Sequence, residues 1–447
     1  TFSFASIYPG GFTPRFIGEV EQRYGTAGLK GELGGGLTYD LSATLARNSL
    51  SLSMTDSLSA SFGPQSQTEF FFGELIQREQ VYNLDLTYPL EVGFASPITL
   101  SAGAEYRREE YEKTVGDTQS YAAGPYATQP LYSLVSPGVY EPVLNVNGVC
   151  PRFNSNLPGT AICTATQSPA ASGYGGVSPA FAGASSQDSY GAYFGAEADI
   201  TDALTMGVAG RYEDYSTFGG AFVWKANALL ELSDVVSVRA TLGTGFHAPS
   251  PGQNNTQIVT TNFRSGNQVQ TGTYPVTSSI AQFYGAESLR PEKSKNYGAG
   301  FVLKPTDNFT LTVDGYIIDV RNRIGISQTF TVTDADLAAL PALAIVGVGG
   351  DVNYFTNGFD TSTKGIDAVA SYRTDLAGSP LSLTMAYSYN KSKVTDFNPS
   401  VISAAQRFNI ANLPPKHRLN TSANWQIGDF QLNGRVNYFS SWANQLE

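Results

Sequence analysis

Residues able to do acid–base or metal chemistry are few in this 447-residue sequence, and they are scattered. The two histidines, His247 and His417, lie far apart and leave little scope for histidine-based metal binding. Glu109, Glu110 and Glu112 form the densest carboxylate group. Paired carboxylates can act as acid and base, but these three follow a predicted strand, and we interpret them as a solvated rim. Since a G-x-S-x-G nucleophile motif is also absent, the sequence predicts no enzyme, no metal site and no cofactor.

The composition is short of charge without being especially hydrophobic. Charged residues make up 15% of the chain, against about 25% in a typical soluble domain, and hydrophobic residues make up 41%. The formal net charge of −11 argues against a nucleic-acid partner, because binding phosphates requires clustered Lys and Arg. No run approaches the roughly 20 apolar residues of a membrane-spanning helix.

Alternation with a period of two residues is the main structural signal. In one segment Tyr190, Ala192 and Phe194 alternate with small or polar residues, and the pattern continues to Ile200. Such alternation predicts strands with one apolar and one polar face. The same pattern recurs at residues 82–88, 98–106, 204–213, 222–232, 236–242, 297–303, 309–313, 381–387, 419–425 and 430–438. We expect about fifteen strands, most of the roughly ten-residue length that a tilted membrane-spanning strand requires.

The connections between these strands alternate in length. Short turns are expected near 39–40, 201–203, 233–234, 305–308, 376–380 and 427–429, and long connections at 114–188, 247–293, 324–363 and 391–416. Short turns on one side and long loops on the other are typical of an outer-membrane barrel. The sequence therefore predicts an all-β, transmembrane antiparallel β-barrel with short periplasmic turns and long extracellular loops. The alternative interpretation is that the apolar parity forms one core face of a soluble all-β protein.

Energetics assign the two faces. In the strands between 190 and 246, six charged side chains fall on the polar parity: Glu197, Asp199, Arg211, Lys225, Glu231 and Arg239. An Arg or Lys facing lipid at mid-bilayer costs about 2–4 kcal/mol, so this parity should line the lumen and the apolar parity should face outer-membrane lipid. Aromatic residues near strand ends are expected to form interfacial girdles: Tyr88, Tyr106, Tyr212, Tyr372, Trp425 and Tyr438.

Five motifs in the second half resemble those of TonB-dependent outer-membrane receptors, in family order and spacing. They are TGFHAPS at 244–250, LRPEKS at 289–294, the segment from Tyr316 to Ile324, KGID at 364–367 and LPPKHR at 413–418. His247 stands where the family usually has Arg, which puts in doubt any charge contact at that position. The resemblance implies a barrel of about 22 strands in the full protein, in the outer membrane of a Gram-negative bacterium.

The same resemblance implies import of a scarce ligand, such as siderophore-iron or an oligosaccharide, with energy from a TonB complex. Because family members carry a plug domain and a final aromatic strand end, we expect residues 1–447 to be a barrel domain incomplete at both ends, with the plug that contacts TonB missing. A complete passive diffusion porin of about 16 strands is the alternative. A barrel enzyme such as a lipase or protease is disfavoured, because no Ser/His/Asp arrangement is present.

Ligand capture is expected in the long loops, where Tyr and Asn offer stacking faces and adaptable hydrogen bonds. The candidates are Tyr121, Tyr126, Tyr132, Asn254, Asn255, Asn262, Phe263, Arg264 and Gln268. Cys150 and Cys163 enclose 12 residues of the first of these loops. At an oxidising cell surface a disulfide is the default, and in the chain-entropy model it stabilises by about 3 kcal/mol. Two free thiols are the alternative.

Overall fold

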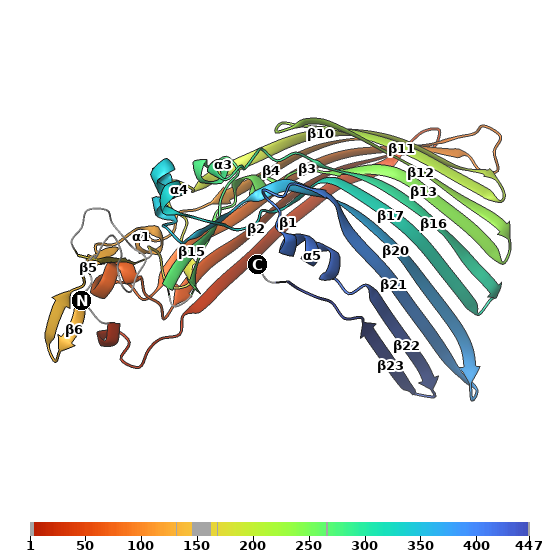
Figure 1. The fold of residues 1–447 in the computed structure, drawn as a ribbon. Helices are drawn as coiled ribbons and strands as arrows, with labels where there is room; N and C mark the ends of the chain where they lie inside the picture. Colours follow the sequence, from red (N-terminus) through yellow and green to blue (C-terminus); the bar gives the residue numbers. More distant parts are fainter. Residues whose placement is uncertain (1–3, 131, 145–161, 168, 265–266, 446–447) are drawn as a thin grey trace.

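The structure is a computed structural model that describes residues 4–130, 132–144, 162–167, 169–264 and 267–445. Fourteen strands of this described chain form one antiparallel sheet in which every neighbour in space is also the next long strand in sequence. Figure 1 shows them side by side as a curved sheet, with tight turns at one end and the loops at the other. The predicted all-β, antiparallel architecture is confirmed, and the expected strand number of about fifteen is close to the fourteen found.

The fourteen strands contain the alternating segments, but most extend well beyond them and beyond the expected length of about ten residues, from 10 residues in the shortest to 22 in the longest. They are β1 (Arg15–Leu33), β2 (Leu37–Thr55), β3 (Phe70–Leu90), β4 (Ile98–Lys113), β10 (Gly183–Thr201), β11 (Leu204–Tyr215), β12 (Gly219–Ser233), β13 (Val236–His247), β16 (Glu292–Thr306), β17 (Phe309–Ile326), β20 (Phe355–Leu376), β21 (Ser379–Phe397), β22 (His417–Ile427) and β23 (Phe430–Phe439).

The turns fall where predicted, with one exception. The sequence predicts a turn near 39–40, but the first turn joins Leu33 to Leu37, and residues 39–40 lie inside β2. Gly35 and Gly36 make this turn with φ angles of 79° and 83°, a left-handed conformation that costs glycine nothing and other residues about 1–2 kcal/mol. The conformational requirement of the turn therefore overrides the alternation pattern there.

The loops contain their own secondary structure. A second sheet has the order β18-β19-β15-β14-β9, and its strands come from three different connections of the barrel. The loop strands are β5 (Thr128–Pro130), β6 (Tyr132–Ser136), β7 (Val139–Pro142), β8 (Thr164–Thr166), β9 (Tyr174–Gly175), β14 (Ile258–Arg264), β15 (Asn267–Thr273), β18 (Phe330–Thr331) and β19 (Asp351–Asn353).

Helices in the described chain are short and lie in the connections. They are α1 (Thr118–Tyr121), α2 (Pro251–Asn255), α3 (Ser279–Phe283), α4 (Asp334–Ala339), α5 (Ala404–Asn412) and the 3-10 turns Phe4–Ser6, Ala60–Gln65 and Pro341–Ile345. None of them has the length and apolar character needed to cross a membrane.

The strand register confirms the assignment of the faces. Directly opposed residues share a face. The register places Ala192 and Phe194 beside uncharged partners on both β4 and β11, whereas Tyr190, nearer the loop end, lies between Tyr106 on β4 and Asp214 on β11. All six predicted girdle residues fall on this outward face. Aromatic pairs continue the girdle between strands: Tyr82 stacks on Tyr106 at a centroid distance of 6.1 Å, and Tyr106 and Tyr190 are tilted to each other at 5.0 Å.

Candidate functional site: the upper lumen and the loop cap

The polar face of the sheet carries a group of charged side chains near the loop end. We name Glu79, Glu105, Arg107, Arg211 and Glu213 the lumenal charge cluster. Arg211 lies 3.2 Å from Glu105 and also pairs with Glu213, and Arg107 lies 3.3 Å from Glu105 and 3.5 Å from Glu79. These side chains come from β3, β4 and β11, whose shared register brings one parity of each strand to the lumen.

Two tyrosine hydroxyls extend this polar wall. Tyr215 donates a hydrogen bond to Glu213 (2.6 Å) and Tyr193 donates one to Asp85 (2.5 Å). Further along the sheet, Asn390 donates to the hydroxyl of Tyr316. A Cβ at Gly365 would meet the Cζ atom of Tyr316 and would overlap the ring. Steric overlap with Tyr316 thus explains why the KGID motif has a glycine at position 365.

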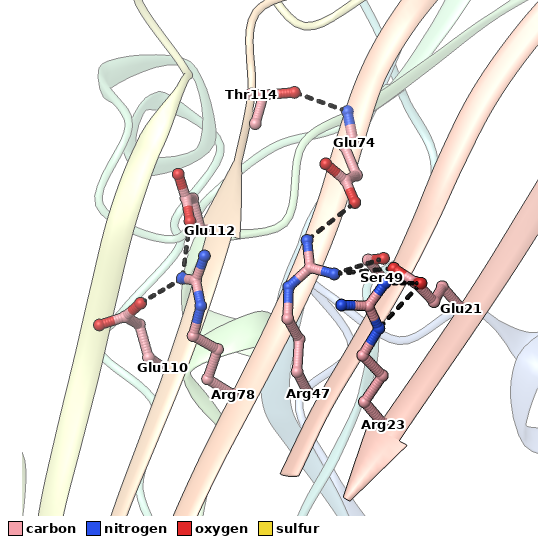
Figure 2. A network of polar contacts seen from close by, with 9 residues as sticks. All are labelled: Glu21, Arg23, Arg47, Ser49, Glu74, Arg78, Glu110, Glu112 and Thr114. Carbon is pink, nitrogen blue, oxygen red and sulfur yellow. Dashed lines mark hydrogen bonds and ion pairs between the residues drawn. The ribbon is translucent and has the colours of Figure 1, made fainter.

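The three glutamates of the predicted rim divide between the two faces. Glu109 points to the lumen and accepts a hydrogen bond from Gln187 (3.3 Å). Glu110 and Glu112 both pair with Arg78 on the outward face. Figure 2 shows that this pairing belongs to a larger set, in which Arg47 links Glu21 to Glu74. Each carboxylate of this set therefore has a cationic partner.

The second sheet and its neighbours form a compact unit that we name the loop cap: β9, β14, β15, β18 and β19 with α3, α4 and the 3-10 turn Pro341–Ile345. Its core includes residues from outside these elements, among them Phe359 of the barrel strand β20 and Val401 and Ile402 of the connection before α5. The eleven buried residues of this core are Tyr274, Ile280, Ala281, Val332, Leu343, Val346, Val352, Tyr354, Phe359, Val401 and Ile402. Burial of this kind contributes about 1.5–3 kcal/mol for each large apolar side chain. The cap is thus folded rather than a set of independent loops.

Aromatic rings order the middle of the cap. Phe330 stacks between Tyr284 and Tyr354, at centroid distances of 5.1 and 5.8 Å. The Tyr354 hydroxyl donates a hydrogen bond to the carbonyl oxygen of Tyr284 (2.6 Å). Burial raises the pKa of Tyr354 to about 12, because a phenolate would be poorly solvated there.

The cap and its neighbouring loops contact the lumenal face of the sheet. Tyr174 of β9 packs against Phe16 and Phe72, with ring centroids 4.9 Å away in both cases. At the end of β4, the ammonium group of Lys113 donates a hydrogen bond to the carbonyl oxygen of Asn255 and so holds α2. The long connections therefore fold inward over the upper lumen.

The structure distributes the predicted ligand residues over different environments. Asn254 and Asn255 lie on α2, where their side-chain amides donate to the carbonyl oxygens of Ser250 and Pro251 (3.4 and 2.8 Å). Tyr121 ends α1, Tyr126 follows it, and Tyr132 opens β6 with 43% of its surface exposed. The backbone of Asn262, Phe263, Arg264 and Gln268 lies in the β14–β15 hairpin, but their side chains lie outside the described part of the chain.

The predicted disulfide is not tested. Cys163 is buried at 1% exposure, whereas Cys150 lies outside the described residues, so the bridge stays a prediction. Within the residues that are described, no group of three or more His, Cys, Asp or Glu side chains is arranged to hold a metal ion. The arrangement offers a mixed-charge lumen wall beneath a folded lid of loops, which is suited to binding and passage of a solute.

A family model described as TonB dependent receptor-like, beta-barrel, matches residues 3–446. The chain belongs to the TonB-dependent receptor family. Receptors of this family lie in the outer membrane of Gram-negative bacteria, and the family and its structural neighbours are transporters and receptors rather than enzymes. The resemblance seen in the sequence motifs is thereby confirmed.

Solved structures with the same fold are distant in sequence. A mutant of the ferric enterobactin receptor PfeA from Pseudomonas aeruginosa is 13% identical with a TM-score of 0.55, over 94% of this chain and 49% of that one. The siderophore receptor PirA from Acinetobacter baumannii is 12% identical with a TM-score of 0.56, over 96% and 52%.

The RagAB peptide transporter is 11% identical with a TM-score of 0.57, over 98% of this receptor chain and 48% of the transporter chain. The chain thus spans about half the length of each of these three structures. No curated protein matches it in sequence. At such low identity these similarities establish the fold.

Proposed function

We propose that this receptor imports a scarce ligand across the outer membrane with energy from the TonB complex, and that it does so without catalysing a reaction. The family match over residues 3–446 carries the proposal. A siderophore bearing iron or an oligosaccharide is the proposed ligand class. The solved neighbours include siderophore receptors and a peptide transporter, which supports import of a small molecule or a short chain.

The loop geometry supports a binding role for the extracellular side. A solute arriving from outside meets the loop cap and then the lumenal charge cluster, where Arg107 and Arg211 share carboxylate partners. We retain the predicted tyrosines and the β14–β15 hairpin as proposed ligand contacts. Tyr132 is the most accessible of the three tyrosines, and stacking on such a ring suits both aromatic siderophores and sugars.

Uptake assays in the source bacterium test the proposal. A deletion strain should lose uptake of one ligand class when grown either under iron limitation or on single carbon sources, and the full-length gene should restore it. Uptake should also stop when the proton gradient is collapsed or TonB is deleted. Uptake that continues without this energy would contradict the proposal and favour the passive porin.

A further inference from the structure

Six cationic side chains gather on the outward face of β16, β17, β20 and β21, near the loop end. We name them the cationic patch: Lys293, Lys295, Arg321, Lys364, Lys391 and Lys393. The register places Lys293 opposite Arg321, Lys364 opposite Lys391 and Lys393 opposite Ser362. All six are exposed. In a chain with a net charge of −11, such a concentration of positive charge requires an explanation.

The patch is not neutralised from within. Like charges directly opposite on adjacent strands are destabilising, and Lys364 faces Lys391 in this way. Within the described chain, no carboxylate forms an ion pair with any of the six cations. Asp319 is the one acidic residue within their rows, opposite Lys295. The positive charge is therefore available to an external anion.

The first four strands of the sheet differ from the cationic patch, although their charged residues also lie on the outward face near the loop end. There the outward-facing arginines of β1–β4 are paired: Arg47 with Glu21 and Glu74, and Arg78 with Glu110 and Glu112 (Figure 2). Positive charges at the loop end of the outward face can therefore have carboxylate partners. The lack of internal partners is a local property of the cationic patch.

The patch lies directly above the membrane-facing band. Below Lys391 the outward residues of β21 are Tyr389, Tyr387, Met385, Leu383 and Leu381. Ten residues of tilted strand cover about 24 Å of height, which matches the apolar band of an outer-membrane barrel, about 25 Å tall. The ammonium groups therefore lie at the level of the headgroups of the outer leaflet.

A groove connects the cations to the apolar band. It has a volume of about 440 Å³. Tyr297 and Ile317 line its apolar part, and its polar part is lined by two lysines and one carboxylate together with two hydroxyl side chains: Lys364, Lys393, Asp319, Ser362 and Thr395. Tyr297 and Ile317 stand opposite each other in the row that also contains Lys364. This combination offers cations to an anionic headgroup and an apolar wall to the chain that is attached to it.

We propose that the cationic patch binds the phosphate-bearing headgroup of an outer-leaflet lipid. Lys is a flexible point charge that suits phosphate, and cationic side chains near an anionic membrane surface add to binding one by one. The occupant is a lipid rather than free phosphate because the groove continues into the membrane-facing band. The bound lipid would relieve the repulsion between Lys364 and Lys391.

Lipid binding by the purified full-length receptor tests this inference. The probe is lipid A with its two phosphates, titrated into receptor held in a neutral detergent and followed by native mass spectrometry. The variant Lys364→Gln/Lys391→Gln/Lys393→Gln should bind this lipid about 100-fold more weakly. A matched control, Lys30→Gln/Lys225→Gln/Lys304→Gln, removes the same charge outside the patch and should bind like the unaltered receptor.

Three results would overturn the inference. The first is equal binding by the patch variant and the unaltered receptor. The second is equal affinity for lipid A from which the phosphates have been removed. The third is full competition by inorganic phosphate at the concentration of the lipid, which would show a site for the free anion. Because receptor uptake is not measured, failure here leaves the proposed import function standing, and loss of import leaves the lipid site standing.

Discussion

Replacing Leu343 by Ala should open the loop cap without unfolding the barrel. Leu343 has 0% exposure and lies in the centre of the core of the cap. A Leu→Ala change at such a site costs about 2–5 kcal/mol, because transfer energy is lost and a cavity remains. At about 3 kcal/mol the open fraction of the cap rises roughly 100-fold.

Hydrogen exchange measures this opening directly. The amide of Val332 donates to the carbonyl oxygen of Gly350 (2.8 Å), and that of Tyr274 donates to Asn353 (2.9 Å). Both bonds hold the cap together, so exchange at these amides should accelerate by the same factor of about 100 in the variant, while amides of β12 and β13 keep their rates. Local opening of this kind is expected where a unit has its own core.

A neighbouring residue supplies the control. Ile345 ends the same 3-10 turn but is 39% exposed, so Ile345→Ala should change exchange by less than about tenfold. Unchanged protection in Leu343→Ala would refute the idea that the cap is a packed unit. Equal acceleration in β12 and β13 would refute its independence from the barrel.

Three further outcomes are expected. Gly365→Ala should destabilise the barrel by about 1–3 kcal/mol, because its Cβ would overlap the ring of Tyr316. Gly434→Ala is the control, because a Cβ there meets open space and should leave stability unchanged. Heat-induced unfolding followed on gels compares the two variants, and equal shifts of their unfolding temperatures would contradict the steric argument. The folded cap raises the pKa of Tyr354 to about 12 from an ordinary value of 10.0, so the stabilisation is full below pH 10 and is lost as the pH rises towards 12. Burial also raises the pKa of Tyr274 and Tyr284 in the same cap, so limited proteolysis across this window should show that Tyr354→Phe reduces the pH dependence without abolishing it; an unaltered profile would argue against a contribution of Tyr354. Thiol titration of the denatured, non-reduced protein should find no free thiol at Cys150 or Cys163, and two reactive thiols would exclude the bridge.

The barrel could be predicted because its determinants are local. The two-residue period fixes strand direction and face, as in Tyr190, Ala192 and Phe194, since lipid and lumen impose opposite requirements on successive residues. The misplaced first turn shows the limit of this argument. Alternation continues through Gly34–Gly36 in sequence, but the backbone of Gly35 and Gly36 turns because only glycine adopts that conformation freely.

The loop cap could not be predicted by the same means. Its core joins Tyr274, Leu343 and Ile402 from three separate connections, and no local pattern indicates that such distant segments pack together. Loop composition suggested ligand contacts, but it did not separate exposed side chains such as Tyr132 from residues already engaged, such as Asn255. That distinction depends on tertiary contacts.

The cationic patch, by contrast, was accessible from sequence. The outward parity of Tyr297, Ala299 and Phe301 extends upstream to Lys295 and Lys293. Lysines on an apolar parity indicate the point at which a strand leaves the hydrocarbon.

The mixed origin of the cap sheet has a consequence for biogenesis. Its strand β9 comes from residues 174–175, yet the sheet also needs β19 at residues 351–353, which pairs with β15 in parallel. Such non-local pairing is slow to form, and here it needs segments from three connections to be present together. The entrance of the receptor can therefore be covered only after the barrel strands that carry these three connections have come together.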